Sequence, residues 1–492
     1  MLTKESKYLI KEINKIKFIP KITSNKIFIS LFDKVYKNYN MTSQNITYKF
    51  EKLDNKNGED LGIIKIFKYI KNDDNLLSNI FSEHNYNENE KEETNSFLDN
   101  IKNDYINDYK KISSLYNYLG EKLSFSIYNL LLNKFFNDEI HQQCKNTNLF
   151  GKFTSINIHQ KIETKMLYRY DITGNNGLCN LKLNLYNNKK CKINNIFYDY
   201  IFFLSKFLNN KDDIILDIWL TKQKKMIPEK NKFQYLGSDE VNSACCSFNP
   251  KMISLWRKEE IMKVCLHELC HFYMLEHQDD KIHLENYIYS HFDIKRTNKI
   301  LIQESITEIY ANLLNTILIS IIYPNQKIKS IKFSKKNKRK KSKKSKKSKK
   351  NSNSFIKYLN IERNFCLFQA AKILNFYNYS KFSDFYKESN INEEDKSSKF
   401  LQKSSIFSYF ILRSILFFSI DKYVELMNKY NNNNILENKI PINELIKLIE
   451  ETLNNTNYQK IIDKLIIKNK NCKNNFFKNT LRYSCLELSI ID

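Results

Sequence analysis

The chain has 492 residues, which is long enough for two or three domains with hydrophobic cores of their own. Hydrophobic residues make up 42% of it and aromatic residues 14%, and this composition excludes a chain that is disordered throughout. The formal net charge at pH 7 is +26, and twelve of the basic residues lie in one run without acids, residues 335–350.

The first 210 residues predict a mixed N-terminal part. Residues 1–105 combine short helical and strand-like runs with a linker rich in Asn and acids, and residues 106–210 predict a domain of helices and strands. Helical spacing occupies 106–150. The later pattern predicts strands at 154–159, 166–170 and 181–186 and an apolar helix at Asn195–Leu208.

Residues 211–325 have the most regular pattern and predict the core that carries the site. Alternation at 214–220 predicts a half-buried strand, and the runs 241–248 and 252–256 predict two more. Apolar spacing predicts one helix over 259–276 and a second over 299–320.

The basic run lies in a low-complexity insertion, residues 326–354, which we expect to be solvated and disordered. A nuclear address or contact with nucleic acid or another polyanion is the less favoured alternative. Residues 355–492 predict a helical C-terminal subdomain. Its helices are expected at 355–378, 380–388, 405–430 and 442–467.

Three features predict a soluble protein in a reducing compartment. The first fifteen residues lack the apolar core of a signal peptide. The apolar stretches 313–323 and 406–420 are too short to span a bilayer. The ten cysteines form neither CxxC pairs nor a dense disulfide framework. We therefore expect an intracellular protein of the cytoplasm, with the nucleus or a virion as alternatives.

The segment HELCH, residues 267–271, carries the predicted chemistry. On a helix His267 and His271 share one face, so both imidazoles can bind one Zn²⁺. Glu268 can then take a proton from a water whose pKa the metal lowers. Residues 264–273 contain no other charged residue, which is typical of a buried helix. The competing interpretation is two core histidines satisfied by hydrogen bonds.

A catalytic zinc needs a third protein ligand. Glu304 and Glu308 lie four apart on an otherwise apolar helix, which predicts Glu304 as the ligand and Glu308 as the partner of a ligand histidine's other nitrogen. His277, six residues after His271, is the alternative ligand. This spacing is that of the metzincin pattern, which places a glycine midway to turn the chain sharply. Here the position is Met274, which does not readily adopt a left-handed turn. A solvent-facing acidic stripe is the interpretation without a metal.

The segments 267–271 and 303–308 (QESITE) resemble the gluzincin clan of zinc metallopeptidases, to which thermolysin belongs. The resemblance implies that Glu304 is the third zinc ligand and that Glu308 orients a ligand histidine. Gln303 stands where the clan has Asn, and Glu308 stands where it usually has Asp.

A second resemblance covers roughly residues 210–425 and is to metallopeptidases encoded by giant DNA viruses. It is carried by VNSACCSF, MISLWRKEEIMKVCLHELCHFY, QESITEIYA and ERNFCLFQAAKIL. Ala244 and the pair Cys245-Cys246 depart from the glycine-containing form of that family's strand.

The gluzincin resemblance also implies a substrate site. In that clan an edge strand beside the zinc helix binds the backbone of the peptide, which implies substrate contacts at Asn242 and Ala244. An ordinary interior strand at 241–248 is the alternative. A donor for the transition-state oxyanion is also needed, and we predict Tyr409 for that role. Its alternatives are Arg413, His283 and His291.

The expected fold is α+β, with a small mixed sheet whose edge strand packs on a zinc-binding helix, followed by the helical C-terminal subdomain. The predicted function is hydrolysis of a peptide or protein substrate by a zinc-bound water that Glu268 activates. One alternative is an inactive metallopeptidase-like protein with a structural or virion-associated role, against which the intact Glu268 argues. The other is a basic nucleic-acid-associated protein, for which no basic stripe exists outside 335–350.

Overall fold

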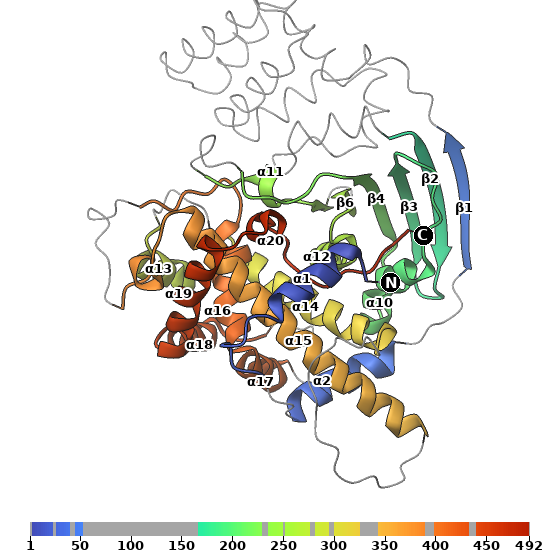
Figure 1. Cartoon of the computed structure of the whole chain (residues 1–492). Helices are drawn as coiled ribbons and strands as arrows, with labels where there is room; N and C mark the ends of the chain where they lie inside the picture. Colours follow the sequence, from blue (N-terminus) through green and yellow to red (C-terminus); the bar gives the residue numbers. More distant parts are fainter. Residues whose placement is uncertain are drawn as a thin grey trace, which may run out of the picture.

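A computed structural model gives the fold, drawn in Figure 1. It describes residues 2–22, 26–39, 45–52, 166–228, 235–248, 251–275, 281–294, 300–324, 343–388, 398–431 and 439–491. The strands are β1 (Asn45–Lys52), β2 (Tyr168–Asn175), β3 (Asn180–Asn187), β4 (Ile214–Thr221), β5 (Ala244–Phe248) and β6 (Lys251–Arg257). The helices before the basic run are α1 (Lys4–Ile13), α2 (Lys26–Asn38), α10 (Asn195–Leu208), α11 (Ser238–Val241), α12 (Ile261–Phe272), α13 (Ile282–His291) and α14 (Ile302–Ile322). The later helices are α15 (Lys343–Phe376), the 3₁₀ turn η1 (Phe382–Asp384), the π-helix η3 (Phe407–Leu412), α16 (Arg413–Phe418), α17 (Ile420–Tyr430), α18 (Ile442–Leu453), α19 (Thr456–Lys470) and α20 (Asn475–Asn479).

The described strands form one mixed sheet in the order β1-β2-β3-β4-β6-β5 (Figure 1). β1, β2 and β3 are antiparallel neighbours, β3, β4 and β6 run parallel, and β5 returns antiparallel to β6. The central strands β4 and β6 are buried along almost their whole length, whereas β5 at the edge is only half-buried. The α+β fold predicted from the sequence, a mixed sheet with an edge strand and a helical C-terminal part, is confirmed.

One face of the sheet forms a core with α12. Leu183, Leu216 and Ile253 lie side by side across β3, β4 and β6. They belong to the same buried cluster as Leu266 and Leu269 of α12. This helix also contacts β5, which places its polar residues beside the open edge of the sheet.

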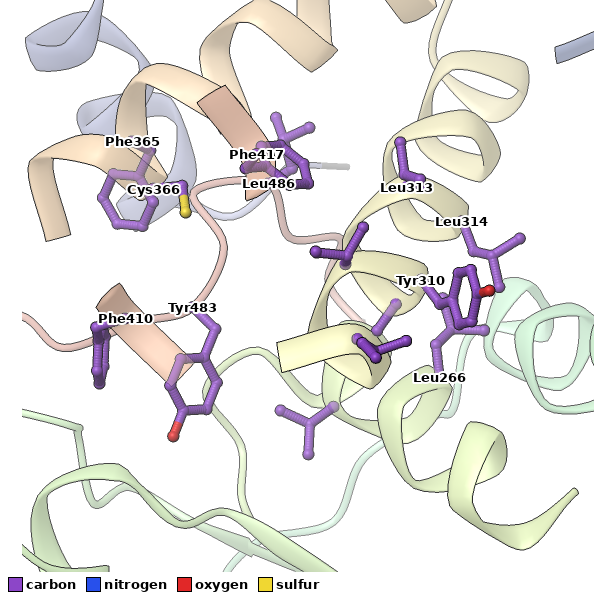
Figure 2. Close-up of a cluster of buried hydrophobic side chains, with 14 of the residues drawn as sticks. Leu266, Tyr310, Leu313, Leu314, Phe365, Cys366, Phe410, Phe417, Tyr483 and Leu486 are labelled. Carbon is purple, nitrogen blue, oxygen red and sulfur yellow. The ribbon is translucent and has the colours of Figure 1, made fainter. Parts of the chain in front are cut away.

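Helix α14 lies between α12 and α15 and forms the centre of the helical layer. Figure 2 shows Leu266 of α12 beside Tyr310 of α14, within a cluster to which α15 also contributes. Helix α14 has 21 residues, and its most apolar 18-residue window has a mean hydropathy of 1.4, so it could span a membrane by length and composition alone. However, 89% of that window is buried inside the protein. Such burial is typical of a helix at the centre of a protein core.

Both ends of the described chain join this core. α1 and α2 pack against α15. After α20 the chain returns to the sheet side, where Leu488 pairs with Leu2 and Ile491 pairs with Ile193 (Figure 1). The described part of 1–105 therefore shares one core with the C-terminal helices.

Two predicted boundaries around the site are wrong for local backbone reasons. The strand predicted at 241–248 begins only at Ala244, because the residues before it form α11 and its turn. The helix predicted at 259–276 ends at Phe272, because Met274 adopts the left-handed conformation, with φ of 53°. Leu275 N–H then donates to Cys270 O over 2.9 Å, which closes the helix end.

Other differences lie in the C-terminal part. α15 begins at Lys343, so the last part of the basic run 335–350 starts a helix instead of belonging wholly to an insertion that ends at 354. The helix expected at 442–467 is two helices, because Asn455 caps the second one. The linker within 1–105, the helical region 106–150 and the strand 154–159 lie outside the described residues.

Candidate metal centre

Helix α12 carries three of the predicted site residues. All twelve of its residues are buried. His267 and His271 are four apart and share one face, and their Nε2 atoms lie 3.0 Å from each other. Glu268 lines the same cleft. Burial raises the pKa of the Glu268 carboxyl, while the two histidines act in the opposite direction.

Glu304, in the first turn of α14, completes the group. Its Oε2 atom lies 3.3 Å from His267 Nε2 and 3.5 Å from His271 Nε2. A tetrahedral zinc with bonds of about 2.0–2.1 Å would separate its donor atoms by about 3.3 Å. Glu304 Oε2 is also buried without a hydrogen bond, a state that a metal ion would satisfy. The three side chains could therefore hold a metal ion, and they are the one such group within the described ranges.

Glu308 lies one helical turn after Glu304 and behind His267. Its Oε1 atom is 2.9 Å from His267 Nδ1, which is ion-pair distance, although Nδ1 makes no aligned hydrogen bond. The carboxylate is thus placed to hold the ring with Nε2 directed at Glu304. The same carboxylate binds Lys263 through Oε1 and Arg413 through Oε2. Burial acts to raise the pKa of Glu308, but Lys263, His267 and Arg413 together hold it well below its usual range. Glu308 is therefore ionised.

A cleft of about 200 Å³ opens over these residues. One wall is β5 with the residues just before it, and the others come from α12, the start of α14, Tyr409 and Tyr483. Among the described lining residues the two histidines are the only basic side chains. The cleft therefore gives access from solvent to the candidate metal centre.

The edge strand β5 presents backbone groups to this cleft. Ser243 O accepts from Trp256 N–H over 2.9 Å, so Ala244 and its partner Leu255 form a pair without mutual hydrogen bonds. The N–H and C=O of Ala244 therefore point away from β6, and those of Cys246, two residues later, do the same. Among the described strands, β5 pairs with β6 alone.

Asn242 lines the cleft but its oxygens have partners within the protein. Its backbone carbonyl accepts from Trp256 Nε1 at 3.3 Å and from Arg257 Nε at 2.7 Å. Its side-chain Oδ1 accepts from Ser404 Oγ at 2.8 Å. These bonds fix the start of β5, and the predicted substrate contact of Asn242 stays a prediction.

Tyr409 reaches the cleft from the π-helix η3. The centroids of its ring and the His267 ring are 6.3 Å apart. Burial and the nearby Glu304 raise the pKa of Tyr409, so its hydroxyl keeps its proton and can donate. Arg413, an alternative donor in the sequence interpretation, is fully buried against Glu308 instead.

The two histidines offered as further alternatives lie on α13. His283 and His291 are not among the described residues that line the cleft. His291 stacks on Tyr287, with ring centroids 4.3 Å apart. His277, the alternative ligand, lies outside the described residues. The expectation that Met274 does not readily adopt a left-handed turn is wrong, since its φ is 53°.

Two residues at the site were missed in the sequence. Lys263 lies one turn before His267 on α12, and that spacing could have identified it. Tyr483 comes from the segment after α20, and nothing in the local sequence marks it. Its hydroxyl donates to Val241 O at 3.0 Å and its ring centroid is 5.0 Å from that of Tyr409.

Comparison of the chain with protein-family models, with curated proteins and with solved structures gives no match in any of the three.

Proposed function

We propose that this protein is a zinc-dependent peptidase whose centre is formed by His267, His271 and Glu304, with Glu268 as the base. The observation that carries the proposal is the set of donor separations, 3.0, 3.3 and 3.5 Å, in a cleft beside an edge strand. These separations suit three ligands of one tetrahedral ion.

The kind of donor atom favours zinc. Two imidazole nitrogens and one carboxylate form a ligand set that catalytic zinc uses, with the fourth position left for water or substrate. Calcium and magnesium prefer sites made of oxygen atoms. Glu308 behind His267 adds the carboxylate–histidine pair that is usual behind zinc ligands.

The position of β5 favours a peptide as the substrate. An extended peptide can bind an open strand edge through backbone hydrogen bonds. Ala244 offers such groups on the cleft side of β5. A substrate strand placed there would run past Glu268 and the three ligand side chains.

In the proposed reaction, bound zinc supplies a polarised water and an electrophile for the carbonyl oxygen. The Glu268 carboxylate accepts the proton of the attacking water and passes it to the nitrogen of the leaving amine. The Tyr409 hydroxyl donates a hydrogen bond to the carbonyl oxygen as negative charge develops there. β5 holds the peptide backbone so that the scissile bond lies over the centre.

The proposal is tested with the purified full-length protein, by metal analysis and by cleavage of a peptide library. We expect one zinc per chain, and a Glu268→Gln variant that keeps its zinc but loses at least about 10²-fold in kcat. Glu304→Gln should lose both the zinc and the activity. A chain without stoichiometric zinc, or a Glu268→Gln variant as active as the wild type, would contradict the proposal.

A further inference from the structure

Glu308 has more positive partners than are needed to orient a histidine. Lys263 binds its Oε1 atom and Arg413 Nη1 binds its Oε2 atom at 2.9 Å. The exposed fractions of these two cationic side chains are 1% and 0%. Glu308 is the only carboxylate within ion-pair distance of either cation among the described residues.

Both cations lie behind the centre, away from the substrate. Neither Lys263 nor Arg413 lines the cleft. Both approach the ring of Tyr483, at 4.7 and 5.6 Å from its centroid, and Arg413 also donates to the Tyr483 carbonyl at 2.9 Å. Direct contact with a peptide in the cleft is therefore excluded as the role of these two charges.

The charges act on the metal through His267. A carboxylate that accepts from Nδ1–H raises the electron density at the ligating Nε2 and strengthens the bond to the metal. Two cations on the same carboxylate oppose this effect, and in a buried site their fields are weakly screened. The three side chains Glu308, Lys263 and Arg413 together carry a net charge of +1, which repels a dication bound at the proposed site.

We propose that Lys263 and Arg413 are positioning residues that weaken the donation of Glu308 to His267 and so keep the zinc strongly electron-withdrawing, at the cost of zinc affinity. This inference rests on the proposed zinc-dependent function. It predicts a change in zinc affinity on loss of Lys263 that is opposite in sign to the change expected if Lys263 only orients Glu308. If Lys263 only held Glu308 in place, its loss would weaken zinc binding; if it opposes Glu308, its loss strengthens zinc binding.

The test uses full-length protein and the variants Lys263→Met, Lys263→Gln and Lys263→Arg. Zinc affinity is measured by competition with a chelator of known affinity, and the ligand geometry by the absorption spectrum of the Co²⁺-loaded protein. The two neutral variants should bind Zn²⁺ roughly tenfold more tightly or better, with the Co²⁺ bands of an intact ligand set and a lower kcat. Lys263→Arg keeps the charge and should stay near the wild type.

Lys263→Gln is included in case the Lys263→Met variant does not fold. The glutamine amide is also neutral, but it can still donate a hydrogen bond to Glu308. Unchanged or weaker zinc binding in the neutral variants overturns the inference while leaving the peptidase proposal intact. A wild-type chain without stoichiometric zinc overturns both.

Discussion

His267 Nδ1 lies 2.9 Å from Glu308 Oε1, and this contact ties α12 to α14 directly behind the candidate metal centre. Arg413, at the start of α16, binds the other oxygen of the same carboxylate. One buried side chain of α14 thus orients a proposed ligand and connects two neighbouring helices. Any change at Glu308 must affect both the metal site and the packing of the helices.

Replacing Glu308 with Ala should therefore have two effects. It leaves Lys263 and Arg413 buried without a counter-charge, which should lower the free energy of unfolding of the zinc-free protein by about 3–5 kcal/mol. It also removes the partner of His267 and should weaken zinc binding about 10- to 100-fold. Urea unfolding and chelator competition measure the two effects.

A matched control is Glu451→Ala, which breaks the exposed pair of Lys422 and Glu451 at 2.8 Å. Its loss should cost less than about 1 kcal/mol, because solvent screens the pair. Equal losses in the two variants would show that the Glu308 cluster has no special role in stability.

The hydroxyl of Tyr409 should matter for the rate more than for binding. Tyr409→Phe keeps the ring beside His267 and removes the proposed donor to the oxyanion. We expect kcat to fall about 10²- to 10³-fold, with KM and zinc content little changed. Steady-state kinetics on a peptide found in the library screen gives the result.

Tyr483→Phe is the control for that experiment. The Tyr483 hydroxyl donates to Val241 O at 3.0 Å, so its loss should cost about 1 kcal/mol of stability with a smaller effect on kcat. A larger loss of kcat for Tyr483→Phe than for Tyr409→Phe would transfer the proposed donor role to Tyr483.

Local spacing explains which parts of this site could be predicted from the sequence. His267 and His271 share a face because helical geometry is fixed, and an acid pair on an apolar helix needs a buried partner, which led to Glu304 and Glu308. Tyr483 could not be predicted in this way. It reaches the site only because the segment after α20 returns through the core, and no local pattern encodes that path.

The fold shows the same limit. Alternation in 214–220 predicted a strand buried on one face only, which is wrong: β4 is buried along almost its whole length, because it lies between the parallel strands β3 and β6. The local pattern says nothing of these neighbours or of their direction. Met274 accounts for a second wrong prediction, the position at which α12 ends. Its left-handed conformation is unfavourable for a side chain with a Cβ, and the hydrogen bond that ends α12 compensates for it.

Stability should depend on pH through Glu362. Burial raises its pKa from 4.5 to about 7, although its Oε1 atom accepts from Ser484 Oγ at 2.7 Å and from Leu486 N–H at 2.9 Å. Because the folded pKa is above the unfolded one, this group's contribution to stability is complete below the unfolded pKa and is lost as the pH rises through about 7.

Glu362→Gln keeps an acceptor oxygen and cannot ionise. The stability of the variant relative to the wild type should therefore rise between pH 5 and pH 8, by an amount on the order of 2–3 kcal/mol. Thermal unfolding of the zinc-free proteins across this range measures the difference. A difference that does not vary with pH would mean that Glu362 does not titrate in this range.

Two proline substitutions in β5 distinguish substrate binding from strand pairing. The N–H of Ala244 points to the cleft side, whereas Cys245 forms the hydrogen-bonded pair with Ser254 of β6. Ala244→Pro should remove one bond to the peptide and raise KM about tenfold, with the melting temperature little changed. Cys245→Pro should break the ladder and cost about 1–3 kcal/mol of stability. If instead Ala244→Pro leaves KM unchanged in a folded, zinc-loaded protein, β5 does not bind the substrate backbone at this residue.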